Sequence, residues 1–111
     1  MNWIPLKSED ELFEIIEKSR SKPQVIFKHS TKCGISSLAK SRLERSVVPD
    51  NTDFYYLDLL AHRNISTKIA DEFNVYHESP QVLLIKNAEC VYAESHAAIS
   101  MDEIEEQLSL N

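Results

Sequence analysis

Three short apolar runs, separated by stretches of helical pattern, place the strongest limit on how this chain can fold. They occupy residues 25–27, 54–57 and 82–85. Each run is short and rich in β-branched or aromatic residues, which is typical of strands buried on both faces. Strands joined through a helix become parallel by a right-handed crossover. The pattern therefore predicts an α/β fold with helices on both faces of one sheet.

The remaining segments complete an α-β-α-β-α-β-β-α order. Ser8 with Glu11, and Ser100 with Glu103, have the spacing of a capping box and predict the starts of the first and last helices. We expect helices over 8–20, 33–45, 64–73 and from 100 onward, and strands over 24–28, 53–59, 81–85 and 90–94. The last two strands form a hairpin across the turn at 87–89. We therefore expect a small mixed four-stranded sheet, two parallel strands plus an antiparallel hairpin, which matches the thioredoxin fold.

The bulk properties exclude several classes of protein. The 111 residues predict a single domain, 1–111, of thioredoxin-like fold. The net charge of −6 argues against nucleic acid as a partner, because phosphate binding needs a basic face. The sequence has no apolar run of the roughly 18 residues that span a bilayer, and residues 1–10 lack the features of a signal peptide. We expect a cytoplasmic protein, in which cysteines are reactive or buried and do not form structural bridges.

Cys33 is the candidate catalytic residue. It follows a buried strand and begins an amphipathic helix, and active sites of open α/β sheets gather at the carboxyl ends of strands. The unpaired N–H groups and the dipole at a helix start stabilise a thiolate, so the pKa of such a cysteine commonly falls below about 8.5. Lys28 and Lys32 are candidates for additional positive charge. The alternative reading of Cys33 as a core residue fits poorly with its polar neighbours.

The motif Cys33-Gly34-Ile35-Ser36 predicts one-cysteine chemistry. Ser36 occupies the position at which a CxxC protein carries its resolving thiol. A hydroxyl there can donate a hydrogen bond to the thiolate but cannot attack a mixed disulfide. Gly34 has no side chain to shield the sulfur. We therefore predict a monothiol site with Cys33 and Ser36 as its catalytic residues and Lys32, Gly34 and Ile35 as the rest of the motif.

Ser79 and Pro80 are candidate substrate-binding residues. They immediately precede the third predicted strand, where a proline cannot donate to the sheet ladder. A cis bond is one use of such a proline, and an ordinary trans proline at a strand start is the alternative. In thioredoxin-like proteins this proline is cis, packs beside the active cysteine, and follows a residue whose backbone groups receive an extended substrate. The element order favours the cis reading.

Other reactive residues carry weaker signals. Cys90 lies at the far end of the third strand from Pro80, about 20 Å away at ~3.3 Å per residue, so a bridge to Cys33 is not expected. We read Cys90 as a buried structural cysteine. The four histidines show no metal-ligand spacing, although His29 and His77 are candidates for lining the site. No metal site is predicted.

Residues 26–36, with Ser79-Pro80-Gln81, resemble the active-site segments of the YtxJ-type monothiol bacilliredoxins of the bacillithiol system. The resemblance extends from Trp3 through the last helix, and departs from the family where Gly34 replaces a common proline. It implies that Cys33 removes bacillithiol, or another low-molecular-weight thiol, from S-thiolated proteins. Bacillithiol would be a co-substrate, with no tightly bound cofactor. The resemblance leaves the oligomeric state open.

Two other functions remain open from the sequence. The motif differs by one residue from the Cys-Gly-Phe-Ser of monothiol glutaredoxins, which bridge a [2Fe–2S] cluster with glutathione, although the turn at 87–89 lacks their glycines. A non-catalytic redox-sensing or binding module is the second alternative. A general dithiol reductase is excluded, because Ser36 replaces the second cysteine and Phe27 occupies the place of the buried aspartate of thioredoxins.

Overall fold

The structure is a computed structural model, and it describes residues 1–110. Its helices are α1 (Glu9–Lys18), α2 (Gly34–Glu44), α3 (Arg63–Phe73) and α4 (Met101–Ser109), with a short 3₁₀ turn, η1 (His96–Ala98). Its strands are β1 (Ile4–Pro5), β2 (Gln24–His29), β3 (Asp53–Asp58), β4 (Gln81–Lys86) and β5 (Glu89–Ser95). The predicted α/β fold is confirmed, and the predicted elements differ from these bounds by one or two residues at most ends.

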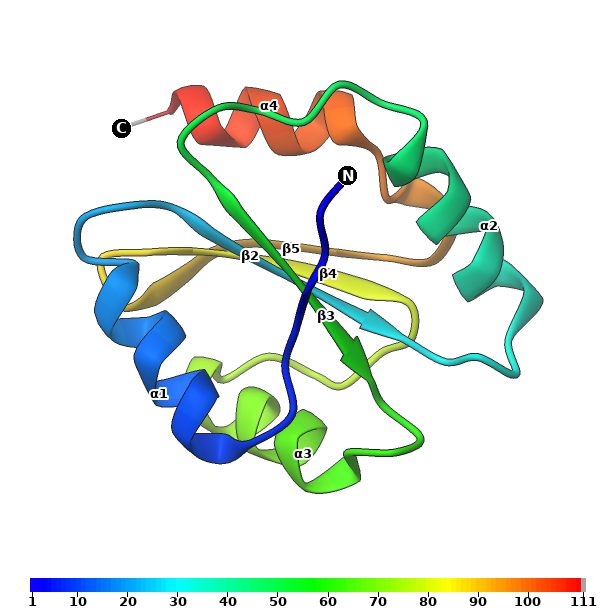
Figure 1. Cartoon of the computed structure of the whole chain (residues 1–111), viewed down its shortest axis with the longest axis horizontal. Helices are drawn as coiled ribbons and strands as arrows, with labels where there is room; N and C mark the ends of the chain where they lie inside the picture. The colour runs from blue at the N-terminus through cyan, green and yellow to red at the C-terminus, as the bar shows by residue number, and fades with distance from the viewer. Residues whose placement is uncertain (111) are drawn as a thin grey trace.

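One mixed sheet with the strand order β1-β3-β2-β4-β5 forms the centre of the molecule. β2 pairs in parallel with β3 and antiparallel with β4, and β4 pairs antiparallel with β5. β2 is the central strand, and all six of its residues are buried. Figure 1 shows α1 and α3 on one side of this sheet and α2 and α4 on the other.

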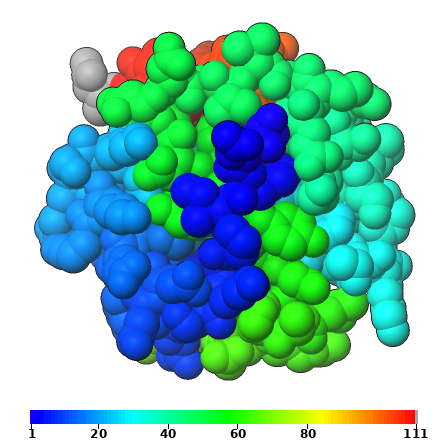
Figure 2. All heavy atoms as spheres, viewed as in Figure 1, coloured from blue at the N-terminus to red at the C-terminus, as the bar shows by residue number. Residues whose placement is uncertain are grey.

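The predicted strand count was wrong: the sheet has five strands in the part of the chain that the structure describes. The additional strand, β1, pairs in parallel with Tyr55 and Tyr56 of β3. The Leu6 N–H extends this pairing by donating to the Tyr56 carbonyl at 2.9 Å. A two-residue strand that contains a proline has no readable hydrophobic period, so only its long-range pairing reveals it. In Figure 2 this N-terminal segment crosses the front of the molecule.

The sheet separates two apolar clusters. Leu12 and Ile15 of α1 and Ile65 and Ile69 of α3 pack on one face, with Ile26 of β2 among their contacts. The other face packs against α2 and α4, and its buried residues are Val25, Phe27, Ala39, Leu43, Phe54, Val82, Leu84, Ile99, Met101 and Ile104. β2 is therefore packed on both faces, and the short loop that ends at Cys33 follows it. None of the helices within residues 1–110 is long and apolar enough to cross a membrane.

Candidate active site

Cys33 is the N-cap residue of α2, at the end of the loop that follows β2. Its backbone is extended, with φ −110° and ψ 118°, and the first helical residue is Gly34. The Cys33 N–H donates to the Ser30 carbonyl at 3.1 Å, and the Cys33 carbonyl accepts from the Ser37 N–H at 3.1 Å. The thiol is free and partly exposed. In Figure 2 the loop between β2 and α2, drawn in cyan, projects from the surface at the lower right.

The helix start lowers the pKa of the Cys33 thiol. The backbone N–H of Ser36 makes the largest contribution, and the Ile35 N–H and the Ser36 hydroxyl add to it, while desolvation opposes them. These two N–H groups belong to the second and third helical residues, which have no carbonyl partner inside the helix. A thiolate at the N-cap therefore gains interactions that a thiol does not, and the site favours the nucleophilic form.

The lowered pKa predicts how alkylation of Cys33 depends on pH. In a Cys90→Ser background, we expect the half-maximal rate of reaction with iodoacetamide at a lower pH than for free cysteine. The rate falls when protonation removes the thiolate, so a lower pKa moves this fall toward acid. Ser36→Ala removes the hydroxyl but keeps the backbone N–H, which is the larger contribution. Its midpoint should therefore rise only slightly, and Ser37→Ala should leave it unchanged. A midpoint at or above that of free cysteine would contradict this reading of the site.

Ser36 lies one helical turn after Cys33 and is fully buried. Its Oγ accepts a hydrogen bond from the Ser30 N–H at 3.3 Å, which ties the loop before Cys33 to the first turn of α2. The hydroxyl hydrogen is then free to face the sulfur, in agreement with its effect on the pKa of Cys33. Ser36 thus supports the thiolate and the loop together.

The rest of the motif leaves the sulfur accessible. Gly34 is exposed, and a Cβ placed on it would meet nothing within 4 Å. Lys32 is exposed, and the side chain of Ile35 is 51 % exposed. Leu38, one turn further along α2, is 56 % exposed. The first turns of α2 therefore carry exposed apolar side chains.

Ser79 and Pro80 lie at the same end of the sheet as Cys33. Lys28 of β2 pairs with Gln81 of β4, so the residues just after β2 and just before β4 lie at the same end of the sheet. The Ser79–Pro80 peptide bond is cis, and Pro80 is buried. The Pro80 carbonyl accepts from the His96 N–H at 3.0 Å. Within residues 1–110, no backbone hydrogen bond is found for Ser79, and its buried hydroxyl also has no partner.

Cys90 lies away from this end of the sheet. It pairs with Ile85 near the opposite end of β4, beside the turn to β5. Its thiol is free and half-buried, packs against the α1 and α3 cluster, and donates to the Tyr92 carbonyl at 3.4 Å. Burial raises the pKa of this thiol, the opposite of the shift at Cys33. The two cysteines therefore have different chemistry.

Three residues suggested as neighbours of the sulfur have other surroundings. Lys28 is fully buried, and its Nζ contacts the His77 ring and the Gln81 side chain. His29 is buried and packs against the rings of Phe27 and Tyr56 at centroid distances of 5.7 and 5.3 Å. Burial, followed by the Lys40 charge, lowers the pKa of His29. None of Lys28, His29 and His77 contributes to the pKa of Cys33, which depends on α2 itself.

The sequence analysis did not identify the polar contacts behind Ser79 and Pro80. Ser66 of α3 contacts His77 Nδ1 at 3.1 Å, and the Gln81 side chain donates to the Tyr76 carbonyl at 3.0 Å. One signal was available: a lysine directly follows the apolar run 25–27 in a strand that reads as buried.

The fold, together with a cysteine at the first turn of the helix after the central strand, defines a thiol redox protein of the thioredoxin-fold class. Residues 4–104 match the family described as monothiol bacilliredoxin BrxC. The chain therefore belongs to the monothiol bacilliredoxin family, in agreement with the resemblance seen in the sequence.

Solved structures support the same fold. One, described as a candidate oxidoreductase with a thioredoxin fold, is 32 % identical, with a TM-score of 0.85 over 96 % of this chain and 93 % of its own. The thioredoxin of Malassezia sympodialis is 18 % identical, with a TM-score of 0.76 over 97 % and 89 %. The thioredoxin of Trypanosoma brucei brucei is 14 % identical, with a TM-score of 0.77 over 96 % and 88 %. The two thioredoxins show similarity of fold alone.

Proposed function

We propose that this protein removes bacillithiol, or another low-molecular-weight thiol, from mixed disulfides on proteins. The observation that carries the proposal is the position of Cys33 as the N-cap of α2, with a serine in place of a second cysteine one turn later. This arrangement supplies a thiolate but no internal thiol to complete a dithiol cycle. Membership of the bacilliredoxin family supports the same chemistry.

The proposed reaction is a thiol–disulfide exchange in two steps. The Cys33 thiolate attacks the bacillithiol sulfur of the modified protein, a new S–S bond forms to Cys33, and the protein thiolate leaves and takes a proton from water. A thiolate from outside the chain then attacks this mixed disulfide and releases Cys33. Neither step changes the total number of disulfides. The lowered pKa of Cys33 favours the first step by raising the thiolate fraction. In the second step it makes Cys33 a better leaving group than a thiol of ordinary pKa.

We infer that the modified protein docks in an extended conformation beside Ser79. No backbone hydrogen bond occupies Ser79 within the described residues, whereas the next residue, Pro80, is held by His96. An extended peptide can hydrogen-bond to such an open backbone edge. Exposed Ile35 and Leu38 provide apolar contacts on the α2 side.

The direct test is to incubate the reduced protein with a model protein that carries bacillithiol on a single cysteine. We expect the model protein to be reduced while the peptide containing Cys33 gains the mass of bacillithiol, and excess thiol should reverse this adduct. A model protein modified with glutathione serves as the comparison for thiol identity. The absence of both the adduct and the reduced model protein would exclude the proposed activity. Equal rates with the two modified proteins would exclude a preference for bacillithiol.

A further inference from the structure

Lys28 is an unusual residue for the interior of this sheet. It lies in the central strand β2 with its side chain fully buried, and its register partners are Leu57 of β3 and Gln81 of β4. An ammonium group inside a protein requires hydrogen-bond acceptors, because burial removes its hydration. A buried charge is also a poor source of stability, since an apolar residue of similar volume often replaces it without loss.

The Lys28 ammonium bonds to two side chains. Its Nζ lies 2.7 Å from His77 Nδ1 and donates to Gln81 Oε1 at 3.0 Å. An ammonium group only donates, so His77 Nδ1 must accept. The Ser66 hydroxyl, 3.1 Å from the same nitrogen, can then act only as a second donor that shares its single lone pair. This arrangement requires a neutral His77 ring with its proton on Nε2.

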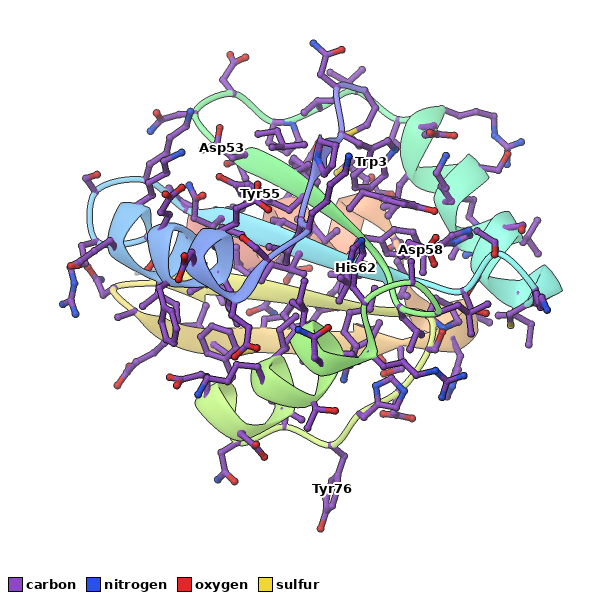
Figure 3. The ribbon with its side chains drawn as sticks, turned by 60° about the horizontal axis from the view of Figure 1, so that its bottom comes forward. Trp3, Asp53, Tyr55, Asp58, His62 and Tyr76 are labelled. Carbon is purple, nitrogen blue, oxygen red and sulfur yellow. The ribbon has the colours of Figure 1, made fainter. Side chains whose placement is uncertain are left out.

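The two residues that Lys28 contacts flank Ser79 and Pro80 in the sequence. His77 precedes it by two residues, and Gln81 follows it directly. The Gln81 amide also donates to the Tyr76 carbonyl at 3.0 Å, so one side chain joins Lys28 to the start of this segment. The carbonyl of Tyr76 is thus held from inside, while its side chain is 92 % exposed and points away from the ribbon in Figure 3.

Glu78, a charged residue of the same segment, connects it to the end of β5. Its carboxylate accepts from the Ser95 hydroxyl at 2.9 Å, and His96 Nδ1 lies 3.8 Å from it. The segment 76–81 is therefore held by Lys28 on one side, and by the last residue of β5 and the residue after it on the other. Between these attachments, no backbone hydrogen bond is found for Ser79 in the described chain.

We propose that Lys28 is a positioning residue whose buried side chain holds segment 76–81 in the conformation that presents the Ser79 backbone to an extended substrate. This inference rests on the proposed function, in which the substrate docks in an extended conformation beside Ser79. It assigns Lys28 no contact with the sulfur, and it predicts an effect on peptide substrates without an effect on the thiolate.

The test compares Lys28→Met with Gln24→Met. Gln24 lies at the other end of the same strand, is equally buried, and bonds to the Lys22 and Pro23 carbonyls and to Asp53. Both variants therefore lose a buried polar group of β2, but only Lys28 lies behind Ser79. Their unfolding midpoints show whether the two variants differ in stability.

The readout is the rate at which Cys33 forms mixed disulfides with two probes. One is a short peptide whose cysteine carries a 2-thiopyridyl disulfide, and the other is 2,2′-dithiodipyridine. In each reaction the Cys33 thiolate forms a new disulfide and 2-thiopyridone leaves, which absorbance follows. For Lys28→Met we expect the ratio of the peptide rate to the small-probe rate to fall about tenfold. This is the effect expected for the loss of about one hydrogen bond between the peptide and the Ser79 backbone. The Gln24→Met ratio should equal that of the wild type.

A second measurement follows the His77 contact without any substrate. Nitrogen NMR of the wild-type protein at neutral pH should show an unprotonated Nδ1 and a protonated Nε2, and Lys28→Met should lose this preference. His77→Ala changes only an exposed residue and should fold even if Lys28→Met does not. We expect it to lower the peptide ratio about threefold, because Lys28 still holds the segment through Gln81.

The proposal is overturned if His77→Ala and Lys28→Met keep the wild-type ratio, if Gln24→Met lowers it equally, or if His77 Nδ1 is protonated in the wild type. A wild-type protein that reacts with neither probe would instead contradict the proposed function. In that case the His77 measurement would still decide whether Lys28 makes the contact on which its positioning role depends.

Discussion

Cys33→Ser is expected to abolish disulfide exchange, whereas Cys90→Ser retains it. The serine hydroxyl stays protonated at neutral pH and cannot replace the thiolate that attacks the disulfide. Cys90 lies near the other end of β4, is half-buried, and has a raised pKa, so it supplies no second nucleophile. The measurement is the release of reduced protein from a model mixed disulfide under excess variant protein.

Cys90→Ser is also a control for folding. A serine can keep the hydrogen bond to the Tyr92 carbonyl, so we expect a stability loss of about 1 kcal/mol or less. Cys33→Ser should unfold at nearly the wild-type temperature, because the side chain is partly exposed and serine is a favoured residue at the N-cap of a helix. Loss of exchange in Cys90→Ser at unchanged stability would refute the assignment of a single active thiol.

Ser36→Cys is expected to convert the site from one-cysteine to two-cysteine chemistry. Ser36 is the third residue of α2, and its hydroxyl already contributes to the lowered pKa of Cys33. A thiol held there would attack the mixed disulfide on Cys33 within the same molecule. The low-molecular-weight thiol would then leave and an internal disulfide would remain. We expect the lifetime of the adduct to fall by about two orders of magnitude or more relative to millimolar external thiol, because the attacking group is already in place.

Intact-mass measurements after a single turnover follow this adduct. In the wild type it should persist until thiol is added, and in Ser36→Cys the protein mass should instead fall by two hydrogens. Ser37→Cys is the matched control, because Ser37 is the next residue of the same helix and is exposed. It adds an equivalent thiol at a position that, unlike Ser36, does not contribute to the pKa of Cys33. An adduct in Ser36→Cys that lasts as long as in the wild type or in Ser37→Cys would show that the position cannot supply a resolving thiol.

Most of the fold could be predicted because the relevant signals are local. Ser8 accepts from the Glu11 N–H at 3.2 Å, and Ser100 accepts from the Glu103 N–H at 3.2 Å, as the two capping patterns require. The apolar run 82–85 forms a fully buried part of β4. Such patterns depend on residues a few positions apart, and tertiary packing reinforces them without changing them. The two-residue strand β1 has no signal of this kind.

By itself, the sequence identified the α/β order, the cysteine that begins a helix, and the absence of a second cysteine one turn later, because each is a relation between near neighbours. Only the tertiary structure decided where Lys28 points. β2 is buried on both faces, so its apolar residues do not alternate with polar ones and do not indicate which face Lys28 joins. Its partners, His77 and Gln81, lie 49 and 53 residues away in the chain, and the register of β2 with β4 determines which of them it meets.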